Sequence, residues 1–195
     1  LTDPSFISLA NVIAGPSGGG PFASGSAAKT WLNDNMYWTS YVGSTGATGA
    51  TGDFNVTISQ VGSDVVWSGS GSFNLTALTS TGANGTSAGY ESDQAIWAIG
   101  PGAPVDTYIG TITYPLTFGT NAVPVTSASG STFGILPGGS GRSLYVPSGY
   151  VSNTTISGTA TYINTTIASA GLTPGTYTWS WGSGANASSL VMVIS

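Results

Sequence analysis

The clearest pattern in this chain is an alternation of apolar and polar positions that begins after Asp53. Phe54, Val56 and Ile58 share one parity, and polar side chains stand between them. After Gly62 the alternation resumes, with apolar residues on one parity at Val65, Trp67, Phe73 and Leu75. A period of two puts alternate side chains on opposite faces of a strand. The segment therefore predicts a β-hairpin with one buried face and one solvated face.

Further short segments rich in β-branched and aromatic residues predict more strands: Tyr108–Tyr114, Ser131–Leu136, Ser143–Val146, Thr159–Ile163, Thr176–Trp181 and Leu190–Ile194. The stretch from Thr79 to Pro104 predicts loop, interrupted by the apolar run Ala95–Ile99. In the last strand, LVMVI, apolar residues on both parities predict burial on both faces. Short strands at this spacing predict an all-β fold, an antiparallel β-sandwich of immunoglobulin-like or jelly-roll-like type.

The segment LTPGTYTWSW, Leu172 to Trp181, is the best local marker of fold. A buried Leu, a Pro-Gly turn and a Tyr entering an alternating strand resemble the corner before the penultimate strand of immunoglobulin-like and fibronectin-type sandwiches. On this interpretation three aromatic side chains face the core, at Tyr177, Trp179 and Trp181.

The first 24 residues predict an extended N-terminal arm. Phe6–Ala14 reads FISLANVIA, which is uncharged, and the Gly-rich hinge Gly15–Pro21 follows it. We expect an arm and hinge over residues 1–24 and a single sandwich domain over residues 25–195. If the arm donates a strand to a neighbouring copy, the residues of this assembly strand are Phe6, Ile7, Leu9, Val12 and Ile13. The alternative is an ordinary first strand with a long loop, because sequential strands usually pair within their own domain.

Charge is scarce in this chain. Its 195 residues include two Lys or Arg and seven Asp or Glu, giving a net charge of −5, whereas about a quarter of an ordinary soluble domain is charged. The hydrophobic fraction of 40% is enough for a real core and is not typical of disorder. Lys29 and Arg142 alone cannot form a nucleic-acid footprint, and no run approaches the roughly 18 apolar residues of a membrane span. We expect no nucleic-acid partner and no membrane span in this chain.

The absence of His and Cys removes most enzyme chemistry. Ser-His-Asp and Cys-His arrangements cannot form, and zinc or haem would lack their usual ligands. A nominal S-x-x-K motif runs from Ser26 to Lys29, but its companion S-D-N and K-T-G motifs are missing. Glu91 with Asp93 or Asp106 could supply paired carboxylates, although a calcium site at Glu91 and Asp93 fits loop carboxylates better. We expect no enzyme, no catalytic residue, no cofactor and no metal, and leave calcium at that loop open.

Six Asn-x-Ser/Thr sequons are spread along the chain, at Asn55, Asn74, Asn84, Asn153, Asn164 and Asn186. Asn55 and Asn74 fall on the polar side of the predicted hairpin, so we expect both side chains to be accessible to a glycan. Asp53 lies two residues before Asn55, as in the extended acidic sequon of bacterial N-glycosylation. Chance sequons in a Thr-rich chain are the alternative interpretation.

Six Trp residues could form a platform that stacks on sugar rings. Most of them stand at core parity, however, including Trp67, Trp179 and Trp181. Trp38 and Trp97 are therefore the candidates for an exposed ligand contact.

Two long segments resemble a known family. GSDVVWSGSGSFNLTALT, from Gly62, and SLYVPSGYVSNTTISGTATYINTTIASAGLTPGTYTWSWGSGANASSLVMVI, from Ser143, are similar to ectodomains of bacterial exported proteins that carry the PEP-CTERM sorting tag. The resemblance covers roughly residues 53–194, and the tag itself is not in this sequence. It implies an extracellular or cell-surface location, often in a biofilm matrix beside exopolysaccharide, and no established enzymatic activity.

These observations favour a secreted, non-enzymatic structural protein, a glycoprotein subunit of an extracellular filament, matrix or surface assembly. Its expected partners are copies of itself, with polysaccharide as a further candidate, and strand donation by the N-terminal arm is the expected mode of self-assembly. Two alternatives stay open: an extracellular glycan-binding module, and a coat or fibre protein of a phage or virus.

Overall fold

The computed structural model describes residues 52–86, 88–139 and 141–195, with the Val123 side chain excepted. The chain divides into two units, Leu1–Thr45 and Gly46–Ser195, and every described residue belongs to the second. The predicted arm, its hinge and the boundary expected between residues 24 and 25 lie outside the described residues.

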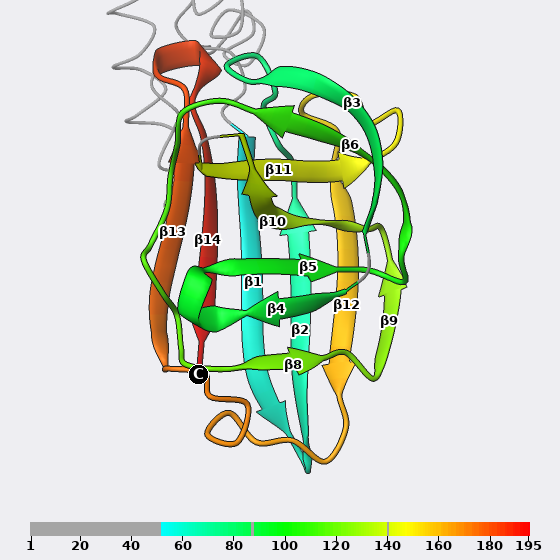
Figure 1. Ribbon diagram of the computed structural model, residues 1–195, viewed down its shortest axis with the longest axis vertical. Coiled ribbons are helices and arrows are strands. Elements are labelled where there is room, and N and C mark those ends of the chain that lie inside the picture. Colours follow the sequence, from blue (N-terminus) through cyan, green and yellow to red (C-terminus); the bar gives the residue numbers. More distant parts are fainter. Residues whose placement is uncertain (1–51, 87, 140) are drawn as a thin grey trace, which may run out of the picture. The chain divides into compact units, whose positions relative to one another are not determined.

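The described chain folds into two seven-stranded sheets that pack face to face (Figure 1). Sheet A contains, in spatial order, β7 (Ile112–Thr113), β13 (Gly175–Trp181), β14 (Ser188–Ile194), β1 (Gly52–Val61), β2 (Asp64–Gly71), β12 (Ile156–Tyr162) and β9 (Ser127–Gly130). Sheet B contains β3 (Thr79–Thr86), β6 (Ala103–Ile109), β11 (Gly141–Pro147), β10 (Phe133–Gly138), β5 (Ile96–Ile99), β4 (Gly89–Glu91) and β8 (Ala122–Pro124). Two short 3-10 helices complete the described elements, η1 (Ser92–Gln94) and η2 (Gly184–Asn186).

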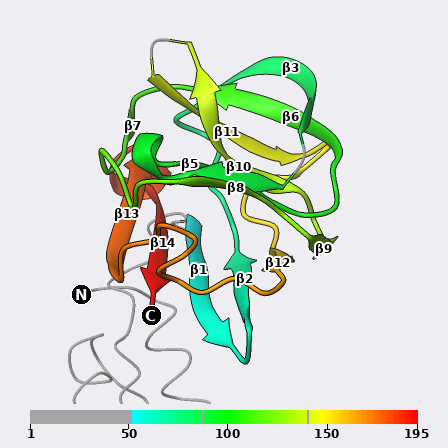
Figure 2. The same ribbon diagram turned by 60° about the horizontal axis from the view of Figure 1, so that its bottom comes forward.

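All the strand pairs of both sheets are antiparallel except β1 with β14, which is parallel. In Figures 1 and 2 the central strands of sheet B run crosswise over those of sheet A, one of the two ways in which sheets pack. The predicted all-β sandwich is confirmed.

An aromatic core fills the space between the sheets. Trp67 of β2 and Trp97 of β5 are fully buried with ring centroids 6.4 Å apart, and Tyr90 of β4 stacks on Trp67 at 5.1 Å. At 4.3 Å, Phe54 stacks on Phe73. Offset stacks and edge-to-face pairs of this kind add to the stabilisation that burial itself provides. Trp67, which the alternation assigned to the core, therefore joins sheet A to Trp97 and Tyr90 of sheet B.

The predicted hairpin is confirmed in its first half. β1 and β2 pair antiparallel from Phe54 opposite Gly71 to Val61 opposite Asp64, around a turn in which Gly62 has a φ of 62°. β2 ends at Gly71, however, and the next apolar positions are not strand. Phe73, Asn74 and Leu75 are buried in succession, so the alternation of faces stops at the strand's end.

Two predictions about strands are wrong. The stretch predicted as loop from Thr79 to Pro104 contains β3, β4 and β5. β3 was missed because its sequence, TSTGANGT, has no apolar face to reveal a period of two. The last strand, β14, is not buried on both faces: Leu190, Met192 and Ile194 face the core, whereas Val193 is 39% exposed on the outer face of sheet A.

The corner before the penultimate strand has the predicted geometry. The Tyr177 hydroxyl donates a hydrogen bond to the main-chain oxygen of Thr173 at 2.9 Å, which ties the start of β13 to the turn before it. Leu172, Trp179 and Trp181 are buried. Tyr177 itself is only half-buried and packs against the rim of the core, its ring 6.0 Å from that of Phe118.

Candidate assembly edge

The two sheets end in four edge strands, and these differ greatly in length. β7 has two residues, β8 has three, β9 has four and β3 has eight. β8 also ends in Pro124, which has no main-chain N–H to offer a partner. β3 is thus the longest edge of the described sheets, and it lies beyond β6 at the margin of sheet B in Figure 1.

Nothing in the sequence of β3 protects its edge by charge. All of its residues are Thr, Ser, Gly, Ala or Asn, and all are exposed except the half-buried Thr86. Natural sheets usually guard long edges with Lys, with Pro or with inward-pointing charges, because unpaired N–H and C=O groups can accept a strand from another molecule. The one feature of that kind in β3 is a register shift between Ser80 and Gly82.

On its inner side β3 is held by β6. The ladder runs from Thr79 opposite Ile109 to Thr86 opposite Ala103, and the Thr81 hydroxyl donates to the Thr107 main-chain oxygen at 3.3 Å. No other strand of the described ranges pairs with β3. Its second row of main-chain groups therefore faces away from the sheet.

Two hollows adjoin this edge on sheet B. One, of about 330 Å³, is lined by Thr81, Gly82, Ala83, Asn84, Thr107, Ile109, Gly138, Gly139, Ser143 and Tyr145. Two of these lining residues, Thr107 and Ser143, have buried hydroxyls without a hydrogen-bond partner among the described residues. The other hollow, of about 460 Å³, includes Arg142, whose guanidinium lies 4.7 Å above the Tyr114 ring. The region beside β3 therefore contains apolar side chains and, beneath the surface, two hydroxyls that have no described partner.

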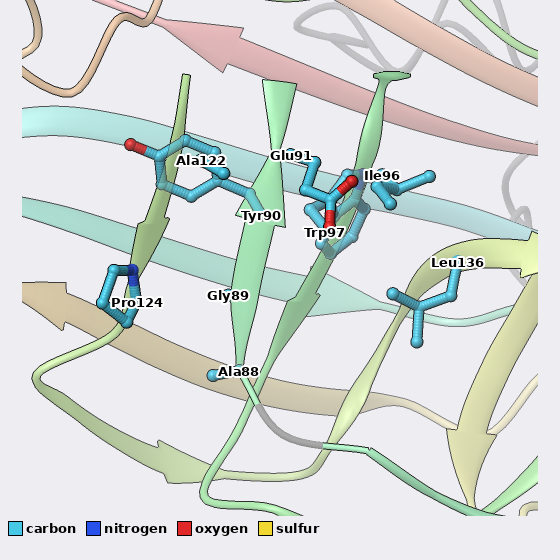
Figure 3. A pocket seen from close by; sticks show the side chains of 9 residues that line it. All are labelled: Ala88, Gly89, Tyr90, Glu91, Ile96, Trp97, Ala122, Pro124 and Leu136. Carbon is cyan, nitrogen blue, oxygen red and sulfur yellow. The ribbon is translucent and has the colours of Figure 1, made fainter. Parts of the chain in front are cut away.

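A third hollow, of about 290 Å³, lies over β4, β5 and β8 and is drawn in Figure 3. Its lining includes Ile96 and Leu136 as well as Tyr90 and Trp97. The Tyr90 hydroxyl donates to the Ala170 main-chain oxygen at 2.8 Å, and burial raises the pKa of that hydroxyl to about 12. Trp97 is 0% exposed, so the expectation that it offers an exposed face to a ligand is wrong.

The remaining Trp predictions are either confirmed or lie outside the described residues. Trp67, Trp179 and Trp181 are core residues, as their parity predicted. Trp38 lies outside the described residues, as do Ser26, Lys29 and the five residues of the expected assembly strand.

Glu91 and Asp106 lie too far apart to form the carboxylate pair that glycoside hydrolysis needs. Glu91 on β4 accepts a hydrogen bond from Gln94 Nε2 at 2.5 Å, and Asp106 on β6 accepts from the Gly149 N–H at 2.8 Å. Four strand spacings of sheet B, roughly 19 Å, separate β4 from β6. Glu91 and Asp93 are exposed, and within the described ranges no three Asp or Glu residues are grouped so that they could hold a metal ion.

Five of the six sequons present an exposed Asn, at Asn55, Asn84, Asn153, Asn164 and Asn186. The sixth contradicts our expectation, because Asn74 is only 3% exposed. Its Nδ2 donates to the Ala185 main-chain oxygen at 3.1 Å and its Oδ1 accepts from the Thr76 N–H at 3.0 Å. The polar parity of the hairpin does not extend to Asn74, because β2 ends three residues earlier.

Comparison with protein-family models, with curated proteins and with solved structures finds no match to this chain. Within the described ranges, no helix has the length and apolar character needed to cross a membrane. The sequence offers only one indication of the β3 edge, which is the absence of charge, Pro and large apolar side chains over eight successive residues.

Proposed function

We propose that this chain is a non-enzymatic structural subunit of an extracellular filament, matrix or surface assembly. In this proposal the N-terminal segment Phe6–Ala14 of one copy adds a strand to the β3 edge of a neighbour. The observation that carries the proposal is β3 itself, an eight-residue exposed edge without a charged side chain.

Strand addition would pair the outward main-chain groups of β3 with the main chain of the donated segment, apart from the Gly85 N–H, which already donates to Asn84 Oδ1. Ile7, Leu9 and Ile13 would be its apolar anchors. Each aliphatic side chain that is fully buried contributes on the order of 1.5–3 kcal/mol before the cost of ordering the segment. The two hollows beside β3 offer Ile109 and Tyr114 as apolar partners.

Low surface charge also supports self-association. A chain with nine charged side chains generates little like-charge repulsion between copies. The exposed sequons and the resemblance to PEP-CTERM ectodomains favour an exported glycoprotein, with the glycans contributing solubility that charge does not.

Three variants test the proposal by negative-stain microscopy and sedimentation of the full chain. Leu9→Asp places a charge at the centre of the donated strand, which cannot be buried in a neighbour's sheet without a large cost. Ala83→Lys places a charge on the acceptor edge, where its cross-strand neighbour in β6 is Asp106. Thr178→Lys is the matched control, since it adds the same charge to the exposed outer face of sheet A.

We expect Leu9→Asp and Ala83→Lys to remain folded monomers with β-type circular dichroism, while Thr178→Lys assembles like the unmodified chain. Normal polymers from Leu9→Asp, or a variant that cannot fold, would make Phe6–Ala14 an ordinary strand of its own domain. Isolated particles of the unmodified chain that bind polysaccharide would favour the glycan-binding module instead. Recovery of the chain from viral particles would favour the coat or fibre protein.

A further inference from the structure

We propose that Asn84 and Gly85 form a self-modifying site, at which loss of the Asn84 side-chain amide converts β3 from an uncharged edge into a charged one. The chemistry of the site stands on the geometry of these two residues. Its effect on assembly rests on the proposed function, in which β3 is the acceptor edge.

The Gly85 N–H is not engaged in the β3–β6 ladder. Gly85 lies opposite Pro104, whose main-chain oxygen accepts from the Ser148 N–H at 3.1 Å and is thus directed to the β11 side of β6, so Gly85 and Pro104 form a non-hydrogen-bonded pair of the ladder. The Gly85 N–H instead donates to Asn84 Oδ1 at 2.9 Å. The main-chain nitrogen is therefore held against the side-chain amide that precedes it.

The space around Gly85 is open. A Cβ placed on Gly85 would meet no atom within 4 Å, and both residues are exposed to water. Asn84-Gly85 is also the only Asn-Gly pair in the chain. By contrast, exposed Asn55, Asn153 and Asn164 are each followed by β-branched Val or Thr, whose side chain crowds the nitrogen that would attack.

The reaction needs only water. After rotation of the Asn84 amide, the Gly85 nitrogen loses its proton and attacks Asn84 Cγ, forming a C–N bond and a five-membered imide ring. Nδ2 leaves as ammonia, taking up a proton. Water then adds to either imide carbonyl and opens the ring, which gives aspartate or isoaspartate at position 84. Because the attacking nitrogen must be deprotonated, the rate rises with pH.

The product would alter β3 in two ways. Its carboxylate would be the only charge between Thr79 and Thr86, and Asp106 lies on the neighbouring strand. Isoaspartate also inserts an extra carbon into the main chain, which shifts the alternation of the strand from that point on. A charged or irregular edge is how sheets resist the addition of a further strand. In molecules whose Asn84 carries no glycan, the site would thus close the acceptor edge once they have aged unassembled.

Peptide mapping by mass spectrometry tests the chemistry on the full chain, produced without N-glycans and incubated as native protein at neutral and alkaline pH. We expect amide loss to accumulate at Asn84 well before Asn55, Asn153 or Asn164, and to give both aspartate and isoaspartate. Its rate should rise with pH. In Gly85→Ala, the loss at Asn84 should fall to the level of the other three asparagines. The proposal would be overturned if Asn84 lost its amide rapidly in the denatured chain but no faster than Asn55 in the native chain. The fold would then protect the site.

Sedimentation tests the consequence. Protein aged until Asn84 is modified, and fresh Asn84→Asp, should lose polymer relative to fresh protein, whereas aged Gly85→Ala and fresh Asn186→Asp should retain it. Full assembly of the aged protein would overturn the switch and leave the chemistry standing. An unmodified chain that never polymerises would overturn the proposed function and the switch together, while peptide mapping still decides the site.

Discussion

The outer faces of the two sheets are built from different side chains. On sheet A the strand registers place short side chains in a row that crosses five strands, Thr176, Val193, Thr57, Ser68 and Thr159. Ser129 of β9 extends this row, its hydroxyl 2.8 Å from that of Thr159. On sheet B the corresponding face carries the half-buried Leu136 and the buried Ile96, Ala98 and Tyr145, together with three hollows and the long β3 edge. Sheet A also has a hollow, of about 340 Å³, but this hollow lies at its β7–β13 edge, whereas sheet B carries two hollows beside the long β3 edge.

The stability of both sheets should depend on their shared core and hardly at all on their outer faces. Trp97→Ala removes a fully buried ring that contacts Trp67 and Trp179 of sheet A, and we expect a loss of about 3–5 kcal/mol in the free energy of unfolding. Thr178→Ala on the outer face of sheet A should change it by no more than about 0.5 kcal/mol. Denaturant titration of the monomer measures both changes. A small effect of Trp97→Ala would contradict a core shared by the two sheets.

Two substitutions in the last strand, β14, test whether one face of sheet A is exposed to solvent. Leu190 is buried, whereas Val193 is partly exposed on the same strand. Leu190→Ala should cost about 2–5 kcal/mol, and Val193→Ala should cost less than about 1 kcal/mol because its side chain already contacts water. Equal losses in thermal or denaturant unfolding would mean that the outer face of β14 is covered in solution.

The long strands of sheet A were the easiest to predict, although β10 and β11 of sheet B were predicted as well and β9 of sheet A was missed. Those long strands have one core face and one solvated face, so Phe54, Val56 and Ile58 alternate visibly with polar residues. In sheet B the residues of β5 are all buried, and those of β3 are nearly all exposed, so neither shows a period of two. The candidate site lies on β3 and could not be located from pattern alone, because pairing with β6 is a long-range property of the fold.

Two of the sequon asparagines, buried Asn74 and exposed Asn55, should differ in their effect on stability. Asn74→Ala leaves the hydrogen-bond partners Thr76 and Ala185 unpaired, and we expect a loss of about 1–3 kcal/mol. Asn55→Ala, on the outer face of sheet A, should change stability by no more than about 0.5 kcal/mol. In glycosylated material, glycopeptide mapping should find Asn74 unoccupied. An intact mass equal to the bare 19.4 kDa polypeptide would end the glycosylation proposal, and a glycan on Asn74 would contradict its burial.

Two phenols between the sheets predict how alkali affects stability. Burial raises the pKa of Tyr90 from 10.0 to about 12, and burial followed by the charge of Tyr90 raises the pKa of Tyr162. Above pH 10 the unfolded chain loses these protons before the folded chain does, so unfolding is favoured. This contribution to stability is complete below about pH 10 and is lost as the pH rises toward 12. Urea midpoints across that range should fall with pH, more in the unmodified chain than in Tyr90→Phe.

In the proposed assembly, copies join through the β3 edge of sheet B and not through the outer face of sheet A. Amide hydrogen exchange of the assembled chain, compared with monomeric Leu9→Asp, measures this directly. We expect the main-chain amides of Thr79–Thr86 and Phe6–Ala14 to become protected together on assembly, while exchange in β13 and β14 stays the same. Assembled material in which Thr79–Thr86 exchanges as fast as in the monomer would contradict this expectation.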